Sequence, residues 1–330
     1  MRLPKLFHKF IYSNFSRVKI FFKYIIQYFQ ADFKVIPHVL VGLFLSVCIY
    51  INYFMTDVRI YDQVVRNNQK SFLLVLFLFA FYAIAFIVSS SIVSLKSGAE
   101  KKPIFNLKFI FFGLIGLFFL SLDSSYYVMQ FTQKLYGENP YVGRWIRSCL
   151  SNLSSSLTVI LPLFILYYSV RHFKPERFGL RLNGAHIRPY FWLILFMIPL
   201  IYGASFQPDF LNTYPTYTDY HEYTVLGIDQ WITAGIYELC YGFDFLSVEL
   251  FFRGFMVIAL SRFVGKDALL PMITVYCFLH FGKPVGEAIS SIFGGYILGI
   301  FAYSSRNIYG GLIAHLGVAW GMDWLAYLNK

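Results

Sequence analysis

Long apolar runs are the feature of this sequence that most constrains its fold. The 330 residues are 58% hydrophobic, 21% aromatic and only 14% charged, which leaves too little polar surface to cover a water-soluble domain. The longest runs reach the roughly 20 apolar residues that a helix needs to cross a bilayer. Because lipid offers no partner to unpaired backbone groups, such segments form helices. The sequence therefore predicts an all-α, polytopic membrane helix bundle.

Nine segments fit helices of this kind, so we expect about eight or nine transmembrane helices. The seventh segment is short, because Gly282 and Pro284 stop a helix soon after His280. We expect that helix end to lie within the membrane and against protein. The expected ranges are 36–55, 71–95, 104–121, 153–170, 189–206, 231–260, 268–281, 287–304 and 308–327.

The basic residues indicate how the chain is oriented. The net charge is +11, and lysine and arginine concentrate in the N-terminal arm and in the loops near 96–102 and 171–181, whereas 207–230 contains neither. The positive-inside rule then predicts a cytoplasmic N-terminus and an outer loop at 207–230. Basic residues confined to short connections also argue against nucleic-acid binding. The four cysteines have no paired spacing typical of a metal or redox site: Cys48, Cys149, Cys240 and Cys277.

Three regions can be distinguished along the chain. Residues 1–33 alternate lysines with apolar residues, which predicts either an amphipathic helix on the anionic inner leaflet or a basic topology anchor. Residues 34–188 form N-terminal transmembrane helices of unknown role. Residues 189–330 follow the basic, proline- and glycine-containing connection at 171–188, which is the best internal boundary.

An ionisable pair lies in the sixth segment, where lipid should tolerate none. Glu249 and Arg253 stand four residues apart in an apolar helix, so both lie on one helix face. A charge in hydrocarbon costs several kcal/mol, and such residues therefore face a bundle interior or a water-filled cavity. Arg253 can hold Glu249 ionised and in one rotamer. The pair indicates either a functional site or a buried structural ion pair.

Further polar groups cluster in the last hundred residues, on four neighbouring predicted helices. Two histidines that join a Glu/Arg pair favour a functional site over isolated core residues. The glycine pairs Gly295/Gly299 and Gly317/Gly321 predict close helix packing in the same region. The clustered polar residues, besides the pair, are Glu238, Asp244, His280, Glu287, His315 and Asp323.

At these residues, from about 230 to 327, the chain resembles the CAAX prenyl-protease and bacteriocin-processing family of intramembrane endopeptidases. That family is marked by the motifs Glu-Glu-x-x-x-Arg, Phe-x-x-x-His and His-x-x-x-Asn. Glu249 and Arg253 match the second glutamate and the arginine of the first motif. Tyr276-x-x-x-His280 is similar to the second motif, with tyrosine in place of phenylalanine, and His315 looks like the histidine of the third.

Two positions depart from the family motifs. Val248 stands where the family has its first glutamate, and Ala319 stands where it has asparagine. Either Glu249 or a nearby acid such as Glu287 takes over the role of base, or the chain is a degenerate member that no longer cuts. The phrase from His280 to Glu287 resembles a variant bacterial branch of the family, which favours a coherent alternative site.

The resemblance implies an intramembrane endopeptidase that cleaves a membrane-embedded peptide or a lipidated protein by glutamate-activated water. A desolvated carboxylate suits this base role. The chain would be a multi-pass protein of the bacterial inner membrane and would bind no nucleic acid. We expect no cofactor, because the histidines lack HExxH spacing, although two histidines and a carboxylate leave zinc as an alternative. The expected catalytic residues are Glu249, His280 and His315, supported by Arg253, Glu287, Tyr276 and Asp323.

Two other interpretations of the sequence remain. A non-catalytic relative would act as a membrane immunity or scaffold protein, and the two departures from the motifs are compatible with either this relative or a peptidase. A transporter would use the intramembrane charges as a relay, but it should also have inverted repeats or paired broken helices, and the sequence has neither.

Overall fold

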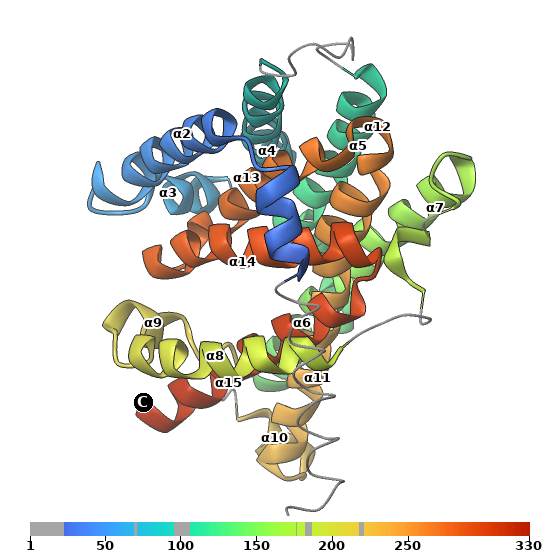
Figure 1. Ribbon diagram of the computed structural model, residues 1–330. Coiled ribbons are helices and arrows are strands. Elements are labelled where there is room, and N and C mark those ends of the chain that lie inside the picture. Colours follow the sequence, from blue (N-terminus) through green and yellow to red (C-terminus); the bar gives the residue numbers. More distant parts are fainter. Residues whose placement is uncertain (1–22, 69–70, 96–105, 176, 182–186, 218–220) are drawn as a thin grey trace, which may run out of the picture.

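The computed structural model describes residues 23–68, 71–95, 106–175, 177–181, 187–217 and 221–330. Within these ranges every regular element is a helix (Figure 1), which confirms the predicted all-α class. Residues 23–31, at the end of the predicted N-terminal arm, are helical, and residues 1–22 of that arm lie outside the described residues.

Five helices in the described part of the chain are long and apolar enough to cross a membrane, which agrees with a polytopic membrane bundle. The fourth of them consists of α6 (Pro140–Ser155), a π-helical segment η2 (Ser156–Ile160) and α7 (Leu161–Ser169). It begins well before the predicted start at 153. The other four are α2 (Val35–Phe54), α4 (Phe72–Ser94), α5 (Leu107–Ser124) and α14 (Val285–Ser305).

Polar caps explain where several helices begin. The side chain of Asn106 accepts hydrogen bonds from the backbone N–H groups of Lys108 and Phe109 at the start of α5. Asp229 caps α11 (Gln230–Glu249) by accepting from the N–H of Trp231. These side chains satisfy donors that the first helical turn leaves unpaired.

The C-terminal region contains the helices that carry the predicted site. The segment predicted as one helix at 231–260 is α11 followed by a π-helical segment, η4 (Leu250–Ala259), and α12 (Ser261–Val264) continues the chain. The predicted short seventh helix is α13 (Leu269–Leu279), which ends in the 3-10 turn η6 (His280–Gly282). Every residue from Leu269 to Phe278 is buried, so this helix is surrounded by protein, as its shortness suggested.

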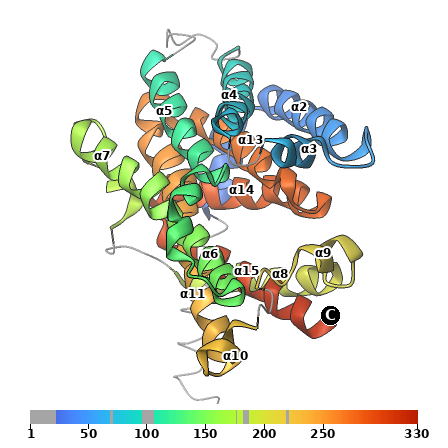
Figure 2. The same cartoon turned by 180° about the vertical axis from the view of Figure 1, so that it is seen from behind.

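Helices from both halves of the chain pack against each other. α13 lies against α4 and α14, and α11 lies against α6. Figures 1 and 2 show α8 (Arg188–Ala204) beside α15 (Tyr309–Asn329), with the short α9 (Pro208–Thr213) near the C-terminus. One apolar cluster joins Leu78 and Phe86 of α4 to Phe255 of η4 and Ile273 of α13. The N-terminal helices therefore pack against the elements that carry the polar residues. The remaining short elements are the α-helices α3 (Ile60–Asn67) and α10 (Glu222–Leu226) and the 3-10 helices η1 (Tyr127–Leu135), η3 (Arg177–Gly179) and η5 (Gly265–Ala268).

The two predicted glycine pairs lie at helix contacts. A Cβ added to Gly299 would come within 2.7 Å of the Met272 side chain of α13, and one added to Gly317 would come within 2.6 Å of Ile194 of α8. Membrane helices associate chiefly through such close packing, because lipid supplies no hydrophobic force between them. The glycines thus let α14 approach α13, and α15 approach α8.

Candidate active site in the membrane

Glu249 and Arg253 form a buried ion pair. Glu249 is the last residue of α11, Arg253 lies in the π-helical segment η4, and the distance from Arg253 Nη1 to Glu249 Oε1 is 3.1 Å. Their side chains are only 0% and 1% exposed, so both charges depend on each other for compensation. π-Helical turns are rare and occur frequently at functional sites.

His315 of α15 joins this pair. Its Nδ1 atom lies 3.1 Å from Glu249 Oε1, and its Nε2 atom lies 3.2 Å from the hydroxyl of Tyr276. One neutral tautomer satisfies both contacts: Nδ1–H donates to the carboxylate and Nε2 accepts from the tyrosine hydroxyl. The result is a hydrogen-bonded chain from Glu249 through His315 to Tyr276, which links α11, α15 and α13.

Aromatic rings surround these polar groups. The guanidinium carbon of Arg253 lies 4.5 Å from the centre of the Tyr276 ring, within the range of a cation–π contact. The Tyr276 ring centre is 4.6 Å from that of His280. The Phe245 ring centre is 4.5 Å from that of His315. The rings lower the local dielectric, which strengthens electrostatic interactions among the polar atoms.

A glycine makes room for the carboxylate. A Cβ added to Gly311 of α15 would lie 2.4 Å from Glu249 Oε2, closer than any ordinary contact. Only glycine at this position lets the α15 backbone approach Glu249 without displacing it. Gly311 is therefore part of the architecture that brings Glu249 and His315 together, and the sequence analysis did not identify it.

Several buried polar atoms of the ion pair retain unused hydrogen-bonding capacity. Glu249 Oε2 and the three guanidinium nitrogens of Arg253 have no hydrogen bond of normal geometry to the described residues. The pair is thus held by charge more than by aligned hydrogen bonds. Because buried polar groups in proteins are nearly always satisfied, these atoms distinguish the pair from ordinary core residues.

His280 contacts Tyr276, which in turn contacts His315 and Arg253. Its Nδ1 atom is 2.7 Å from the backbone carbonyl oxygen of Tyr276, so Nδ1–H donates and Nε2 is left as an acceptor. Of the three residues expected to be catalytic, Glu249 and His315 are thus in direct contact, and His280 is one residue removed.

Glu287 and Asp323, two residues expected to support the site, bind the segment after α9. Glu287 Oε2 accepts a 2.8 Å hydrogen bond from the hydroxyl of Tyr214. Asp323 accepts from the backbone N–H and the hydroxyl of Thr216 at 2.8 and 2.6 Å. These contacts hold a connecting segment against α14 and α15. Neither carboxylate is hydrogen-bonded to the Glu249 cluster.

Two partly buried acids, Asp123 and Asp244, also carry side-chain hydrogen bonds and were not selected from the sequence as site residues. The hydroxyl of Thr158 donates a 2.6 Å hydrogen bond to Asp123 Oδ1, and that of Ser247 donates a 3.1 Å bond to Asp244 Oδ1. Asp244 was recognised as an intramembrane polar residue without a role. Asp123 was missed because the predicted helix ended at 121, whereas α5 continues to Ser124.

Within the residues that the structure describes, no three histidine, cysteine, aspartate or glutamate side chains are grouped closely enough to hold a metal ion. The expectation of a mechanism without cofactor or metal stays a prediction.

Comparison with known proteins assigns the class of this region. Residues 226–321 match the family model for type II CAAX prenyl endopeptidase, Rce1-like. Comparisons with curated proteins and with solved structures find no match. The match confirms, over residues 226–321, the resemblance to the CAAX prenyl-protease family that the motifs indicated. The matched residues include Glu249, Arg253, Tyr276, His280 and His315.

Proposed function

We propose that this protein is an intramembrane endopeptidase in which Glu249 and His315 together activate water. The observation that carries the proposal is the position of Glu249 Oε1, which lies 3.1 Å from both Arg253 Nη1 and His315 Nδ1. A carboxylate held by a cation and bonded to an imidazole fixes the tautomer and direction of that imidazole. The family match in the same region supports peptide-bond hydrolysis.

The side chains of Glu249 and His315 differ in how far they are exposed. Glu249 has no exposed side-chain surface, whereas His315 is 15% exposed. In the proposed mechanism His315 Nε2 therefore takes a proton from water once the Tyr276 hydroxyl moves aside, and Glu249 stabilises the resulting imidazolium. The water oxygen bonds to the scissile carbonyl carbon, the carbon–nitrogen bond breaks, and the proton passes to the leaving amine.

His280 has a positioning role in this mechanism. Its Nδ1–H is occupied by the Tyr276 carbonyl, so its Nε2 atom can accept a hydrogen bond from the attacking water and orient it. Arg253 pairs with Glu249 and lies over the Tyr276 ring. Glu287 and Asp323 would act indirectly, because their hydrogen bonds fix the segment that contains Tyr214 and Thr216.

The proposed substrate is a membrane-embedded peptide or a lipidated protein. The ion pair lies inside a bundle of apolar helices, where a peptide must itself enter the membrane to reach it. The proposed location is the bacterial inner membrane, with the N-terminus in the cytoplasm and the loop at 207–230 outside, as the distribution of basic residues predicts.

A non-catalytic scaffold is the second candidate, and specific observations favour it. Val248 and Ala319 replace two polar residues of the family motifs, and both are packed among apolar side chains or buried. The sealed Glu249–Arg253 pair would then serve only to hold α11, η4 and α15 in place.

The experiment that separates the two candidates is a hydrolysis assay in liposomes. The reconstituted protein is given single-span and lipidated peptides in ¹⁸O-labelled water, and products are analysed by mass spectrometry. A peptidase incorporates labelled oxygen into the new carboxylate, and Glu249→Gln abolishes the label. Cleavage that is equal in wild type and in Glu249→Gln would be contamination. Absence of any labelled product across the substrate panel would favour the scaffold.

A further inference from the structure

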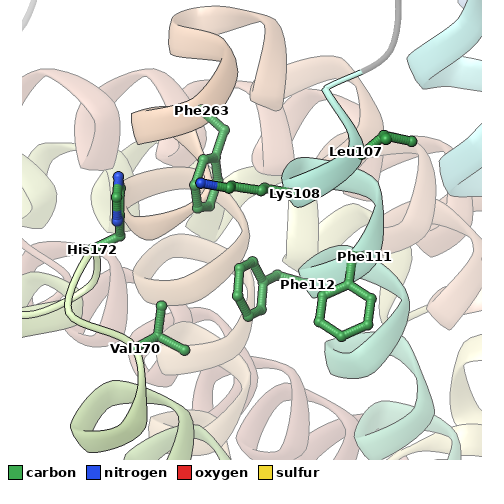
Figure 3. Close-up of a pocket in the computed structure, with 7 residues that line it drawn as sticks. All are labelled: Leu107, Lys108, Phe111, Phe112, Val170, His172 and Phe263. Carbon is green, nitrogen blue, oxygen red and sulfur yellow. The ribbon is translucent and has the colours of Figure 1, made fainter.

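A groove on the outside of the bundle lies apart from the candidate active site. It has a volume of about 460 Å³ and lies between the first turns of α5, the segment after α7 and the end of α12 (Figure 3). Its position does not involve Glu249, His280 or His315. The groove is lined by Leu107, Lys108, Phe111, Phe112, Val170, His172 and Phe263.

Stacked rings make up much of the wall of this groove. The ring centres of Phe112 and Phe263 are 5.8 Å apart with an interplanar angle of 14°, and those of His172 and Phe263 are 5.8 Å apart at 21°. Phe111 meets Phe112 edge-on at 5.3 Å and is 59% exposed. Flat apolar surface of this kind fits an acyl chain lying along it.

The polar side chains that line the groove lie near the ends of two helical segments that can cross the membrane, which is the level of the lipid headgroups. Lys108 is the second residue of α5, a helix that can cross the membrane from Leu107, and His172 follows shortly after the end of α7 at Ser169. Phe111 is about one helical turn deeper than Lys108. Figure 3 shows the Lys108 side chain extending from α5 into the groove. Polar groups at headgroup level above apolar walls match the layout of a phospholipid.

The positive charge of the residues around the groove favours phospholipids with anionic headgroups. Lys108 is exposed, His172 is an exposed polar residue of the same groove, and Arg171 and Lys174 are exposed on the connection that carries His172. None of the described residues that line the groove is acidic. Basic residues near a membrane surface attract anionic headgroups. A zwitterionic headgroup would gain less from this arrangement.

We propose that this groove binds one anionic phospholipid, with its phosphate beside Lys108 and His172 and one acyl chain along Phe111, Phe112 and Phe263. The buried Phe173 packs behind the groove, with its ring centre 5.1 Å from that of Phe112 and 6.0 Å from that of Phe255 in η4. The bound lipid therefore braces α5 against the segment that carries Arg253, and binding stabilises the fold by mass action.

Native mass spectrometry tests this proposal directly. Detergent-purified protein is titrated with phosphatidylglycerol or with phosphatidylcholine of the same acyl chains. We expect one phosphatidylglycerol to be retained at least ~10-fold more strongly than phosphatidylcholine, together with a higher melting temperature. Inorganic phosphate should not displace the lipid, because it lacks the acyl chain.

Two variants and a matched control locate the site. Lys108→Glu should remove the preference for phosphatidylglycerol, whereas Lys134→Glu, the same charge change at another exposed lysine, should preserve it. Phe111→Ser should weaken the binding of both lipids. Because the Phe111 side chain is exposed, its replacement should leave the fold intact. Equal retention of the two lipids by wild type, or equal effects of the two lysine variants, would overturn the proposal. The readout is bound lipid, so the result is independent of peptidase activity.

Discussion

His315 Nδ1 lies 3.1 Å from Glu249 Oε1, although the two residues are 66 positions apart in the chain. The contact joins α15 to the end of α11 and places a partly exposed imidazole next to a fully buried carboxylate. The contact adds His315 to the Glu249–Arg253 pair, whose charges would be costly to bury singly. The same contact accounts for the glycine at 311, because α15 must come close to Glu249 for His315 to reach it.

Replacing Gly311 with alanine should disrupt the site. The new Cβ would lie 2.4 Å from Glu249 Oε2, so the carboxylate or α15 must shift. Displacements of this order in catalytic groups cost up to about 100-fold in rate, and we expect turnover by Gly311→Ala to fall at least ~10-fold. Gly321→Ala on the same helix is the control, since its Cβ would meet Ile201 at an ordinary 3.8 Å. Wild-type turnover in Gly311→Ala would show that this close approach is unimportant.

The ion pair should contribute to stability in a way that can be separated from catalysis. Glu249→Gln leaves the buried charge of Arg253 uncompensated, which we expect to cost about 3–5 kcal/mol. The double variant Glu249→Gln/Arg253→Met removes both charges and should recover most of the lost thermal stability while remaining inactive. Thermal unfolding in detergent and liposome turnover measure the two effects. A double variant that is less stable than the single one would contradict this account of the pair.

Tyr276 should act through its ring more than through its hydroxyl. Tyr276→Phe keeps the ring under Arg253 and beside His280, so we expect a loss in turnover below ~10-fold. Tyr276→Leu removes the ring and should lower both turnover and stability further. Inactivity of Tyr276→Phe equal to that of Glu249→Gln would instead make the 3.2 Å contact between the hydroxyl and His315 Nε2 essential.

The activity should not depend on a metal ion. The account uses Glu249 and His315 to activate water, so purified protein should contain less than one zinc per ten chains and retain turnover in strong chelators. Elemental analysis and activity are measured on the same samples before and after chelation. About one zinc per chain, lost together with activity, would identify the protein as a metalloprotease.

Local sequence patterns predicted much of the fold. Helix ranges followed from apolar runs, and the early end of α13 followed from Gly282 and Pro284. The π-helical segment η4 was predicted as ordinary helix, because apolar composition does not distinguish the two backbone hydrogen-bond registers. The end of α5 was placed at 121, whereas the helix continues to Ser124 and Thr158 donates a hydrogen bond to Asp123 in its last turn.

The candidate site was predictable only in part. The spacing of Glu249 and Arg253 placed them on one helix face, and the family motifs indicated His315. The requirement for glycine at 311 could not be inferred, because glycine is common in membrane helices and only its distance from Glu249 gives it meaning. The hydrogen bonds from Thr216 to Asp323 come from a connecting segment whose packing no local pattern encodes.

The most direct test of the central claim compares Glu249→Gln with Glu287→Gln in the liposome assay, with turnover corrected for the folded fraction. Glu249 is bonded to His315, whereas Glu287 is bonded to Tyr214, outside the cluster. We predict that Glu249→Gln lowers turnover at least ~100-fold, because His315 then loses the carboxylate that fixes its tautomer and stabilises its imidazolium, and that Glu287→Gln has a much smaller effect. Loss of turnover in Glu287→Gln with near-normal turnover in Glu249→Gln would contradict the account and leave Glu249 only as the structural partner of Arg253.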